Sequence, residues 1–448
     1  MKHVDAVVIG GGILGCMTAR NLRRWHISTL LIEKEADVCR GITRANSAIV
    51  YAGYDNKPGS LKAALTVRGN TNMASLCEEL EVPFFRCGSL LVTYDEESVP
   101  RLHKKLKNGI RNGVPGLKLL SGAEAEAMEP MLKPGVAAAL YAPSTGTVNP
   151  WQLGIAAFEN ALQNGAEAAL NTRVLGIRKM EKGYVVETRE DAYACKMVFN
   201  CAGLSADKVQ ELLFPPSVRL DLDGAEYLVF DELAPKPERI IFHQADRCGK
   251  GITAIPCVEG NLLISGVRKP MGIPFATTAE GLQELREAAR DLLPGVELNQ
   301  IIRSFGAVRP NPYLENGESL HDFCIENPVP DFYSLIGIKT PGLTCANELG
   351  LYLAVRAAAY LGADQNPAFD PHRPAIQKKD APDYYEMICQ CEGVTRGQIL
   401  EAIRRGATTV DGVKRRVGSG MGRCQGSRCS WEIVKILKET GANPEPLF

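Results

Sequence analysis

The first 35 residues contain two short apolar runs separated by a helical pattern. Val4–Ile9 (VDAVVI) is rich in β-branched residues, which is typical of a buried parallel strand. Apolar residues then recur on one helical face from Cys16 to Trp25, and a second apolar run follows at Ser28–Ile32. The pattern therefore predicts a strand–turn–helix–strand unit at the start of the chain.

The turn of this unit has a glycine spacing that suits a dinucleotide. Gly10, Gly12 and Gly15 form G-x-G-x-x-G: the first permits a tight turn, the second a close approach by pyrophosphate, and the third helix–strand packing. The helix N-terminus supplies free N–H groups for the diphosphate. Glu33 ends the second strand, where a carboxylate accepts the ribose hydroxyl protons. An acid here disfavours a 2′-phosphate, so the sequence predicts FAD or NAD rather than NADP.

The pattern further along the chain predicts a mixture of helices and strands. Small and polar residues dominate 39–60, which predicts a long functional loop beside the first site. Residues 218–305 alternate short strands with turns, as in an antiparallel second domain. A helix is predicted to start near Ala346, after a Pro-Gly turn. Other helices are predicted at Leu61–Leu80, Ser98–Asn112, before Gly165, and at Glu280–Leu292, Thr395–Arg405 and Trp431–Thr440, and strands at Arg86–Thr93, Asn171–Lys179, Gly183–Thr188 and Lys196–Gly203.

Length, charge and cysteine content narrow the class of protein. At 448 residues the chain is too long for one ordinary core, so two or three domains are expected. The net charge of −1 gives no sign of nucleic-acid binding. The first strand leaves no room for a secretory signal, and no apolar run approaches the roughly 18 residues of a membrane span. A cytoplasmic protein is expected, with its 14 cysteines as free thiols or metal ligands.

Four cysteines near the end of the chain form two close pairs. Cys389 and Cys391 are separated by one residue, and Cys424 and Cys429 by four. Four thiolates in this arrangement suit zinc or a [2Fe-2S] cluster. The spacing differs from the C-x2-C of zinc ribbons, which favours iron–sulfur, and the surrounding glycines leave N–H groups able to bond the sulfurs. The alternative is four buried free cysteines.

Several motifs together carry a family resemblance. The N-terminal unit, the loop RANSAIVYAGYDNKPGSLKA, and the segments NCAGLSADKV and GIKTPGLT resemble the D-amino-acid-oxidase (glycine-oxidase-like) superfamily of FAD enzymes. Within it, the chain is similar to anaerobic-type FAD-dependent glycerol-3-phosphate dehydrogenases and to L-2-hydroxyglutarate oxidases. The C-terminal segment, with MGRCQG around its third cysteine, resembles the BFD-like (bacterioferritin-associated ferredoxin) [2Fe-2S] domain.

The resemblance implies an α/β fold with three parts. A Rossmann-like FAD-binding domain is combined with an antiparallel-sheet substrate domain, and a small helical iron–sulfur domain follows. A stretch with four prolines between the second and third parts has the composition of a linker. The expected boundaries are 1–80, 145–215 and 330–365 for the FAD-binding domain, 81–144 and 216–329 for the substrate domain, 366–385 for the linker and 386–448 for the BFD-like domain.

The resemblance also implies roles for individual residues. Arg309, in GAVRPNP, matches an arginine that faces the flavin in relatives and holds a substrate carboxylate or phosphate with its two-pronged guanidinium. The cluster ligands are the four cysteines named above. The residues matched to FAD binding are Gly10, Gly12, Gly15, Glu33, Arg44, Asn46, Ser47, Val174, Ala202, Gly203, Gly337, Gly342, Leu343 and Thr344.

One position departs from the family pattern. The chain has Tyr51 where relatives usually have a histidine near the flavin that is a candidate acid or base. A tyrosine hydroxyl forms hydrogen bonds, but its ordinary pKa near 10 makes it a poor base at neutral pH. Tyr51 is therefore a candidate catalytic residue with side-chain packing as the alternative, and His243 is a second candidate base, with a surface position as its alternative.

The implied function is an FAD-dependent dehydrogenase of a small hydroxy compound, either glycerol 3-phosphate or a 2-hydroxy acid. Hydride passes to the flavin, and electrons leave one at a time through the cluster. The expected partner is a second flavoprotein or a quinone-linked subunit, with no nucleic acid and at most peripheral membrane association through that partner. The alternatives are an amine or amino-acid (opine or imino-acid) dehydrogenase and a non-catalytic electron-transfer subunit.

Overall fold

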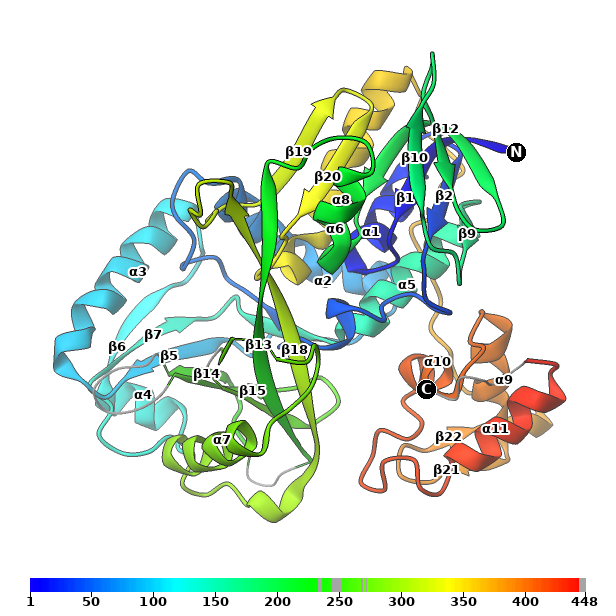
Figure 1. Ribbon diagram of the computed structural model, residues 1–448. Coiled ribbons are helices and arrows are strands. Elements are labelled where there is room, and N and C mark those ends of the chain that lie inside the picture. Colours follow the sequence, from blue (N-terminus) through cyan, green and yellow to red (C-terminus); the bar gives the residue numbers. More distant parts are fainter. Residues whose placement is uncertain (233–235, 244–250, 267–268, 271, 443–448) are drawn as a thin grey trace.

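The computed structural model describes residues 1–442 apart from 233–235, 244–250, 267–268 and 271. Two large sheets and a separate C-terminal helical domain make up the molecule (Figure 1). The α/β fold expected from the sequence, with its FAD-type domain, antiparallel second domain and small helical third domain, is confirmed.

The first sheet is built around the N-terminal unit. β1 (Lys2–Ile9) pairs in parallel with β2 (Thr29–Ile32) and β12 (Ala192–Asn200), and α1 (Ile13–Leu22) connects β1 to β2. The predicted strand–turn–helix–strand unit is therefore present, although the helix ends at Leu22. The other strands of this sheet are β9 (Glu167–Ala169), β10 (Gly176–Lys179), β11 (Tyr184–Glu187), β19 (Cys324–Val329) and β20 (Phe332–Ile336).

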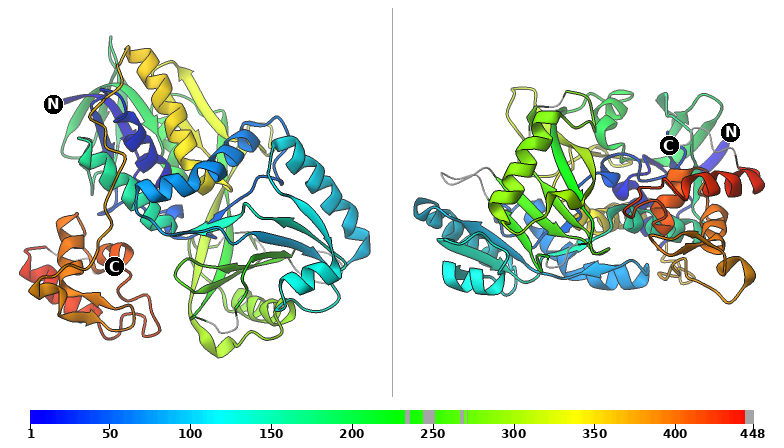
Figure 2. Two further views of the ribbon diagram at one scale, coloured as in Figure 1. Left: turned by 180° about the vertical axis from the view of Figure 1, so that it is seen from behind. Right: turned by 90° about the horizontal axis from the view of Figure 1, so that it is seen from below.

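Helices cover one face of this sheet. α1 packs between α5 (Pro150–Gln163) and α8 (Gly342–Leu361), and α2 (Leu61–Glu79) packs on α8 (Figure 2). Their apolar side chains and those of β1 form one buried core. The elements of this sheet and its helices come from three separate stretches of the chain. β19 pairs with β20 in this sheet, although its residues fall within the predicted substrate domain.

The second sheet is antiparallel except where β5 pairs in parallel with β14. Its longest strands, β13 (Val218–Phe230) and β18 (Ile301–Leu314), form a two-stranded ribbon that reaches from this sheet to the first domain (Figure 1). Its other strands are β5 (Ser89–Thr93), β6 (Lys118–Ser121), β7 (Ala138–Ala142), β14 (Ile240–His243), β15 (Ile252–Pro256), β16 (Leu262–Ser265) and β17 (Lys269–Pro270).

Further helices and a small sheet complete the first two domains. The helices are α3 (Val99–Asn112), α4 (Gly122–Met128) and α7 (Ala279–Leu292), with the short α6 (Ala206–Glu211) after β12. The small sheet joins the long loop to the substrate domain through β3 (Ile49–Val50), β8 (Gly146–Val148) and β4 (Phe84–Phe85).

Two predicted strands are shorter than expected because positive backbone angles precede them. Asn171 has φ +52° and Gly88 has φ +74°, which interrupts an extended chain. β5 therefore begins at Ser89, directly after Gly88, whereas β10 begins at Gly176, five residues after Asn171. In contrast, α8 begins at Gly342, four residues before the predicted start. Pro341 directly precedes it, where a missing N–H costs the helix nothing.

The segment predicted as a linker is bound along the first domain. After α8 it runs down the back of that domain to the C-terminal helices (Figure 2, left). Arg20 donates to the carbonyl of Pro371 at 3.1 Å, and Asn160 donates to the carbonyl of Asp370 at 3.0 Å. Arg373 is buried against Glu159, with Nη2 at 2.6 Å. Residues 366–375 therefore form an ordered strap rather than a flexible tether.

The C-terminal domain has its own apolar core around three helices. These are α9 (Arg396–Arg404), α10 (Val410–Val417) and α11 (Ser430–Glu439), beside the hairpin of β21 (Met387–Cys389) and β22 (Val394–Thr395). The predictions of α9 and α11 hold to within one residue at each end, whereas α10 was not predicted.

An ion pair in this domain gives a pH-dependent prediction. Hydrogen bonds from Arg404, and then from Arg405, lower the pKa of Glu401 to about 2. A lowered pKa stabilises the fold above the ordinary glutamate pKa of about 4.3, and the contribution is lost as the pH falls towards 2. Glu401→Gln is expected to reduce stability at pH 7 and progressively less at lower pH, as measured by urea unfolding. An equal loss at pH 7 and pH 3 would contradict this.

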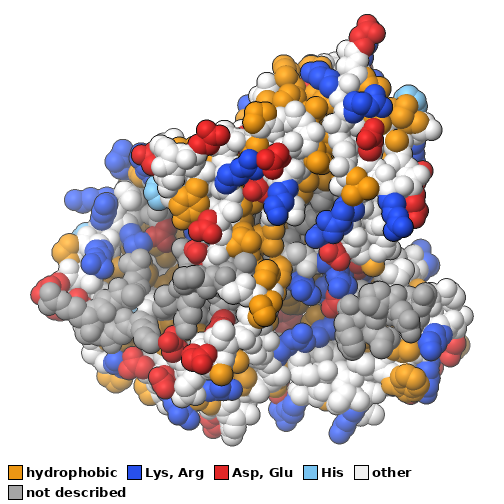
Figure 3. Space-filling model, viewed as in Figure 1, with side chains coloured by type: hydrophobic (Ala, Val, Ile, Leu, Met, Phe, Trp, Pro, Cys, Tyr) orange, Lys and Arg blue, Asp and Glu red, His pale blue; other side chains and the backbone are white. Residues whose placement is uncertain are grey.

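Charges of both signs are interspersed on the face of the molecule shown in Figure 3, which agrees with the near-neutral net charge. Within the described part of the chain, no helix has the length and apolar character needed to cross a bilayer.

Candidate functional site

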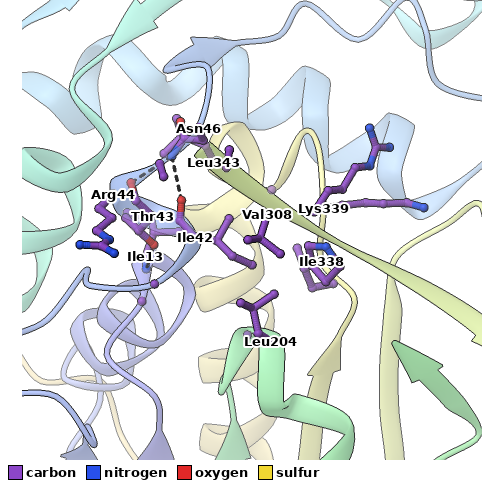
Figure 4. A pocket seen from close by; sticks show the side chains of 18 of the residues that line it. Ile13, Ile42, Thr43, Arg44, Asn46, Leu204, Val308, Ile338, Lys339 and Leu343 are labelled. Atoms are coloured by element: carbon purple, nitrogen blue, oxygen red, sulfur yellow. Dashed lines mark hydrogen bonds between the residues drawn. The ribbon is translucent and has the colours of Figure 1, made fainter. Parts of the chain in front are cut away.

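A cavity of about 530 Å³ lies where the β13–β18 ribbon meets the first domain. It is lined by the glycine turn, the long loop, the segment after β12, the ribbon and the start of α8 (Figure 4). The predicted site residues that line it are Gly10, Gly12, Glu33, Arg44, Asn46, Ser47, Tyr51, Ala202, Gly203, Arg309, Gly342 and Leu343. Gly15, Val174, Gly337 and Thr344 are not among the lining residues.

The glycine turn fits closely against its neighbours, as the spacing predicted. Gly10 has φ +103°, and a Cβ on it would lie 2.6 Å from the carbonyl oxygen of Cys201. A Cβ on Gly15 would lie 1.8 Å from the carbonyl oxygen of Gly10, so this glycine permits the contact between helix and turn. Gly12 caps α1 without a side-chain hydrogen bond, and no acidic residue lies in the first turn. The helix N-terminus therefore keeps its positive end towards the cavity, which suits a diphosphate.

Glu33 lies at the cavity edge, at the end of β2. Its carboxylate accepts the Gly11 N–H at 2.5 Å and the Glu35 N–H at 2.9 Å. Burial raises the pKa of Glu33 above its ordinary value, despite these two hydrogen bonds. The carboxylate is thus fixed at the position that the sequence predicted for a ribose contact.

Asn46 fixes the shape of the long loop. Its side-chain nitrogen donates to the carbonyls of Ile42 and Thr43, and its side-chain oxygen accepts the N–H of Ala48 at 2.8 Å (Figure 4). Ala48 has a φ of +58°, which this local bonding holds. The side chain of Asn46 therefore positions the residues on either side of it against the cavity.

Tyr51 lines the cavity and also packs against the substrate domain. Its ring stacks on Phe242 with centroids 6.1 Å apart, and its hydroxyl lies 3.4 Å from Ser47 Oγ. The backbone N–H of Tyr51 donates to Thr344 Oγ1 at 3.0 Å. Thr344 thus ties the loop to α8 although it does not line the cavity, and its predicted role in FAD binding stays a prediction.

Two cationic side chains meet the cavity at the ribbon end. Arg309 lines it from β18, and its buried Nε has no hydrogen-bond partner among the described residues. Lys339 lines it from the turn before α8, at the opposite side of the view in Figure 4 from Arg44. The Nζ of Lys339 donates to Asn311 Oδ1 at 3.0 Å, and the Asn311 amide donates to Asp223 Oδ2 at 2.8 Å.

Lys339 was missed in the sequence, as were Tyr227 and Phe275. The signal for Lys339 was a lone charge in the otherwise apolar IGIKTPGL. Tyr227 lines the cavity and stacks on Phe305 at 4.6 Å, and the Arg44 guanidinium lies 5.3 Å from the Phe275 ring. The aromatic contacts depend on strand register and could not be read from the chain.

His243 and Val174 lie elsewhere. His243 is buried beside Tyr94, edge-to-face at 5.4 Å, and is not among the cavity residues. Its predicted surface position is wrong, because it belongs to β14 of the second sheet. Val174 is half-buried against the core of the first sheet. Its predicted contact with the adenine side stays a prediction.

The four predicted cluster cysteines lie as two pairs of neighbours. Cys389 contacts Cys429, and Cys391 contacts Cys424. Cys389 and Cys429 are buried, whereas Cys391 is exposed. Nowhere in the described ranges do three or more His, Cys, Asp or Glu side chains form a ready-made metal-binding group, so assigning all four thiolates to one cluster stays a prediction.

The backbone around these thiols suits sulfur ligands. Hydrogen bonds from the N–H groups of Arg428 and Gly426 lower the pKa of Cys424 to about 7, whereas burial raises the pKa of Cys429 to about 12. A Cβ on Gly422 would lie 2.7 Å from Cys391 Cβ, so this glycine lets the two segments approach. N–H groups directed at sulfur help to set the reduction potential of an iron–sulfur cluster.

Comparison with known proteins agrees with this geometry. The chain is 38% identical to a glycerol 3-phosphate dehydrogenase from Caloramator mitchellensis, over 97% of this chain and 93% of that protein. It is 26% identical to an L-2-hydroxyglutarate dehydrogenase from Indibacter alkaliphilus, over 77% and 96%.

Solved structures share the fold. The glycerophosphate oxidase of Mycoplasma pneumoniae with FAD bound superposes with a TM-score of 0.77 at 24% identity, covering 83% of this chain and 99% of that one. Glycine oxidase from Geobacillus kaustophilus superposes with a TM-score of 0.71 at 21% identity, covering 83% and 97%.

Two family models match separate parts of the chain. One, described as FAD dependent oxidoreductase (DAO), matches residues 5–356, and the other, described as BFD-like [2Fe-2S] binding domain, matches residues 387–439. The expected cofactors, FAD and a [2Fe-2S] cluster, are confirmed at the level of the domains. The chain belongs to the DAO family of FAD-dependent oxidoreductases and carries a BFD-like [2Fe-2S] domain at its C-terminal end.

Proposed function

We propose that this chain is a dehydrogenase that oxidises the secondary hydroxyl of glycerol 3-phosphate. The observation that carries the proposal is the pair of cations at the ribbon end of the cavity, Arg309 and Lys339. The buried Nε of Arg309 has no hydrogen-bond partner in the described part of the chain. A cavity with two cations at its ribbon end suits an anionic substrate there. The 38% identity with a glycerol 3-phosphate dehydrogenase over almost the whole chain supports the same substrate.

The two cations suit a phosphate better than a single carboxylate. A phosphate monoester carries about −1.5 to −2 charge at pH 7 and offers three acceptor oxygens. The fork of Arg309 binds two oxygens at once, and Lys339 adds a point charge for the third. Asn311 holds the Lys339 ammonium at 3.0 Å, so the second cation is positioned before substrate arrives.

The remaining side chains orient the hydroxyl to be oxidised. FAD supplies the hydride acceptor when bound. We assign Tyr51 and Ser47, whose hydroxyls lie 3.4 Å apart, as the groups that bind the substrate hydroxyl. The anion held by Arg309 and Lys339 then fixes the other end of the substrate. Such two-point binding would direct the C–H hydrogen at bound FAD for transfer as hydride, and the hydroxyl proton would leave through the Tyr51 hydroxyl to solvent.

We also propose that electrons leave the chain through the iron–sulfur domain to a protein partner. A [2Fe-2S] cluster carries one electron at a time, which suits onward transfer to a second flavoprotein or a quinone-linked subunit. The exposure of Cys391 supports this, because it leaves one side of the predicted cluster open to a partner.

A 2-hydroxy dicarboxylate is the second candidate substrate. Two cations also suit a substrate with two carboxylates, and the 26% identity with an L-2-hydroxyglutarate dehydrogenase favours it. An amine or amino-acid substrate is less well supported, because an amino acid carries a single carboxylate. A non-catalytic electron-transfer role is also less well supported, because a cavity that binds no substrate does not require two cations.

Lys339→Met tests whether Lys339 binds the substrate anion. Removing the ammonium is expected to lower kcat/KM for glycerol 3-phosphate by about 10- to 100-fold, since a hydrogen bond to a charged group contributes about 1.5–3 kcal/mol. FAD content should stay unchanged. The measurement is steady-state kinetics with glycerol 3-phosphate and L-2-hydroxyglutarate. Lys105→Met, which removes an exposed ion pair with Asp55, is the matched control. Equal kcat/KM in wild type and Lys339→Met would contradict the role of Lys339.

A further inference from the structure

The loop between β2 and the short helix at Ile42–Arg44 contacts two domains at once. Its residues Lys34, Glu35, Arg40 and Arg44 line the FAD cavity. The same loop carries Asp37 and Val38, which are buried beneath α10 of the iron–sulfur domain. One short segment therefore forms part of the cofactor site and part of the interface between domains.

Asp37 is the centre of this interface. Its side chain is 1% exposed and accepts hydrogen bonds from two arginines of α10. Arg415 Nη2 lies 2.8 Å from Oδ2, and Arg416 lies 2.7 Å from Oδ2 and 3.1 Å from Oδ1. Neither arginine is more than 3% exposed at its side chain. These are desolvated charges whose principal partner lies in another domain.

Further contacts hold the loop backbone and its far end. Arg415 Nη1 donates to the carbonyl of Val38 at 2.5 Å. Arg40, which lines the cavity, lies 3.4 Å from Asp411 of α10. Asp411 in turn accepts from Arg415 Nε at 3.1 Å. The α10 side chains thus contact the loop at Asp37, at Val38 and at the cavity-lining Arg40.

Glu159 of α5 extends the network to the strap. It lies 3.3 Å from Arg416, 3.2 Å from Arg405 and 2.6 Å from Arg373. Glu159 has its side chain 8% exposed, and its three partners come from α10, the end of α9 and the strap. The docked position of the iron–sulfur domain is therefore fixed on two sides by buried ion pairs.

Separation of the two domains would remove most of the arginine partners of Asp37 and Glu159 and would expose these charges to water. The loop conformation that satisfies Asp37 is also the one that presents Arg40 and Arg44 to the cavity. Any ligand that prefers this loop conformation also favours docking, and the coupling is reciprocal.

We propose that the docked iron–sulfur domain is a structural part of the FAD site: α10 holds the loop at residues 34–44 in the conformation that binds FAD. FAD binding and domain docking then strengthen each other. The cofactor that transfers electrons into the cluster is retained best when the cluster domain is in place. The inference rests on the FAD site and is independent of the proposed substrate.

The test uses Asp37→Asn and Asp411→Asn in the full-length protein. Asp411 lies in the iron–sulfur domain and does not line the cavity, so its effect on FAD must pass through the interface. Each variant is expected to raise the FAD dissociation constant by about 5- to 150-fold, the usual range for coupled sites. FAD binding is measured by flavin fluorescence, and docking by proteolysis of the strap. Glu432→Gln, an exposed acid of the same domain, is the matched control.

A second measurement tests whether FAD binding strengthens docking of the iron–sulfur domain. Adding FAD to FAD-depleted protein is expected to slow proteolysis of the strap and hydrogen exchange in residues 34–44. The proposal is overturned if Asp411→Asn speeds strap proteolysis while FAD affinity equals that of Glu432→Gln. It is also overturned if both variants leave docking and FAD affinity unchanged. Because no substrate is used, these outcomes are separate from failure of the proposed function.

Discussion

Arg309→Lys is expected to lower kcat/KM for glycerol 3-phosphate by roughly 30- to 5,000-fold while FAD stays bound. The guanidinium presents a planar fork that binds two oxygens, and a lysine ammonium cannot reproduce this geometry. Truncating one partner of a buried charged pair costs about 2–5 kcal/mol, which gives the stated range. The buried Nε without a partner in the described structure is the local reason to expect an effect this large.

The same strand pair offers a control for Arg309→Lys. Arg219 lies on β13, half exposed and paired with Glu211 outside the cavity. Arg219→Lys is expected to leave kcat/KM and FAD content at wild-type values. Steady-state kinetics and flavin absorbance measure both effects. If Arg309→Lys keeps more than half of the wild-type kcat/KM, the substrate anion binds elsewhere.

Cys429→Ser is expected to abolish the iron–sulfur cluster while substrate still reduces the flavin. A [2Fe-2S] cluster of this type is held by four thiolates, and a serine hydroxyl is a poor replacement for a buried thiolate ligand. Cys429 is 1% exposed beside Cys389, so the vacancy cannot be filled by solvent. Electron delivery to a one-electron acceptor should fall to background, because the exit route is lost.

Iron and sulfide analysis of the purified protein measures this effect directly. Cys87→Ser is the matched control, because Cys87 is a half-buried thiol of the substrate domain. It is expected to keep a full complement of iron. Normal iron content in Cys429→Ser would show that this cysteine is not a ligand. Loss of flavin reduction by substrate in Cys429→Ser would show that the cluster takes part in the first step.

The N-terminal unit and the cysteine pairs were predictable because each depends on local spacing. Gly10 and Gly15 have no room for a side chain, so the spacing of the glycines in G-x-G-x-x-G is enough to predict the turn. The position of Glu33 at the cavity edge was predictable in the same way, because it directly follows the second strand. The paired spacing of Cys389, Cys391, Cys424 and Cys429 indicates ligands without any knowledge of the fold.

The contacts that were missed depend on long-range pairing. Lys339 is held by Asn311, which is held by Asp223 across the register of β13 and β18. No local pattern predicts this chain of contacts between three distant segments. The ordered strap was also missed, because its proline-rich composition is typical of a linker and its partners lie in α1, α2 and α5.

α10 was missed for a different reason. Its sequence VDGVKRRV contains an internal glycine and adjacent charges, which weakens a helical prediction. Arg415 and Arg416 are buried because Asp37 and Glu159 of the first domain pair with them. Adjacent arginines in a sequence are normally interpreted as surface residues, so a buried interface formed by charged side chains cannot be predicted from the sequence pattern.

Anaerobic titration of the intact protein with glycerol 3-phosphate tests the central claim most directly. The visible absorption of oxidised flavin and of the oxidised cluster is followed together as substrate is added, with L-2-hydroxyglutarate and several amino acids as comparisons. The account predicts that glycerol 3-phosphate bleaches the flavin fastest and that reduction of the cluster follows. If the protein contains both cofactors and glycerol 3-phosphate bleaches neither, it is not the substrate, and the proposed function is wrong.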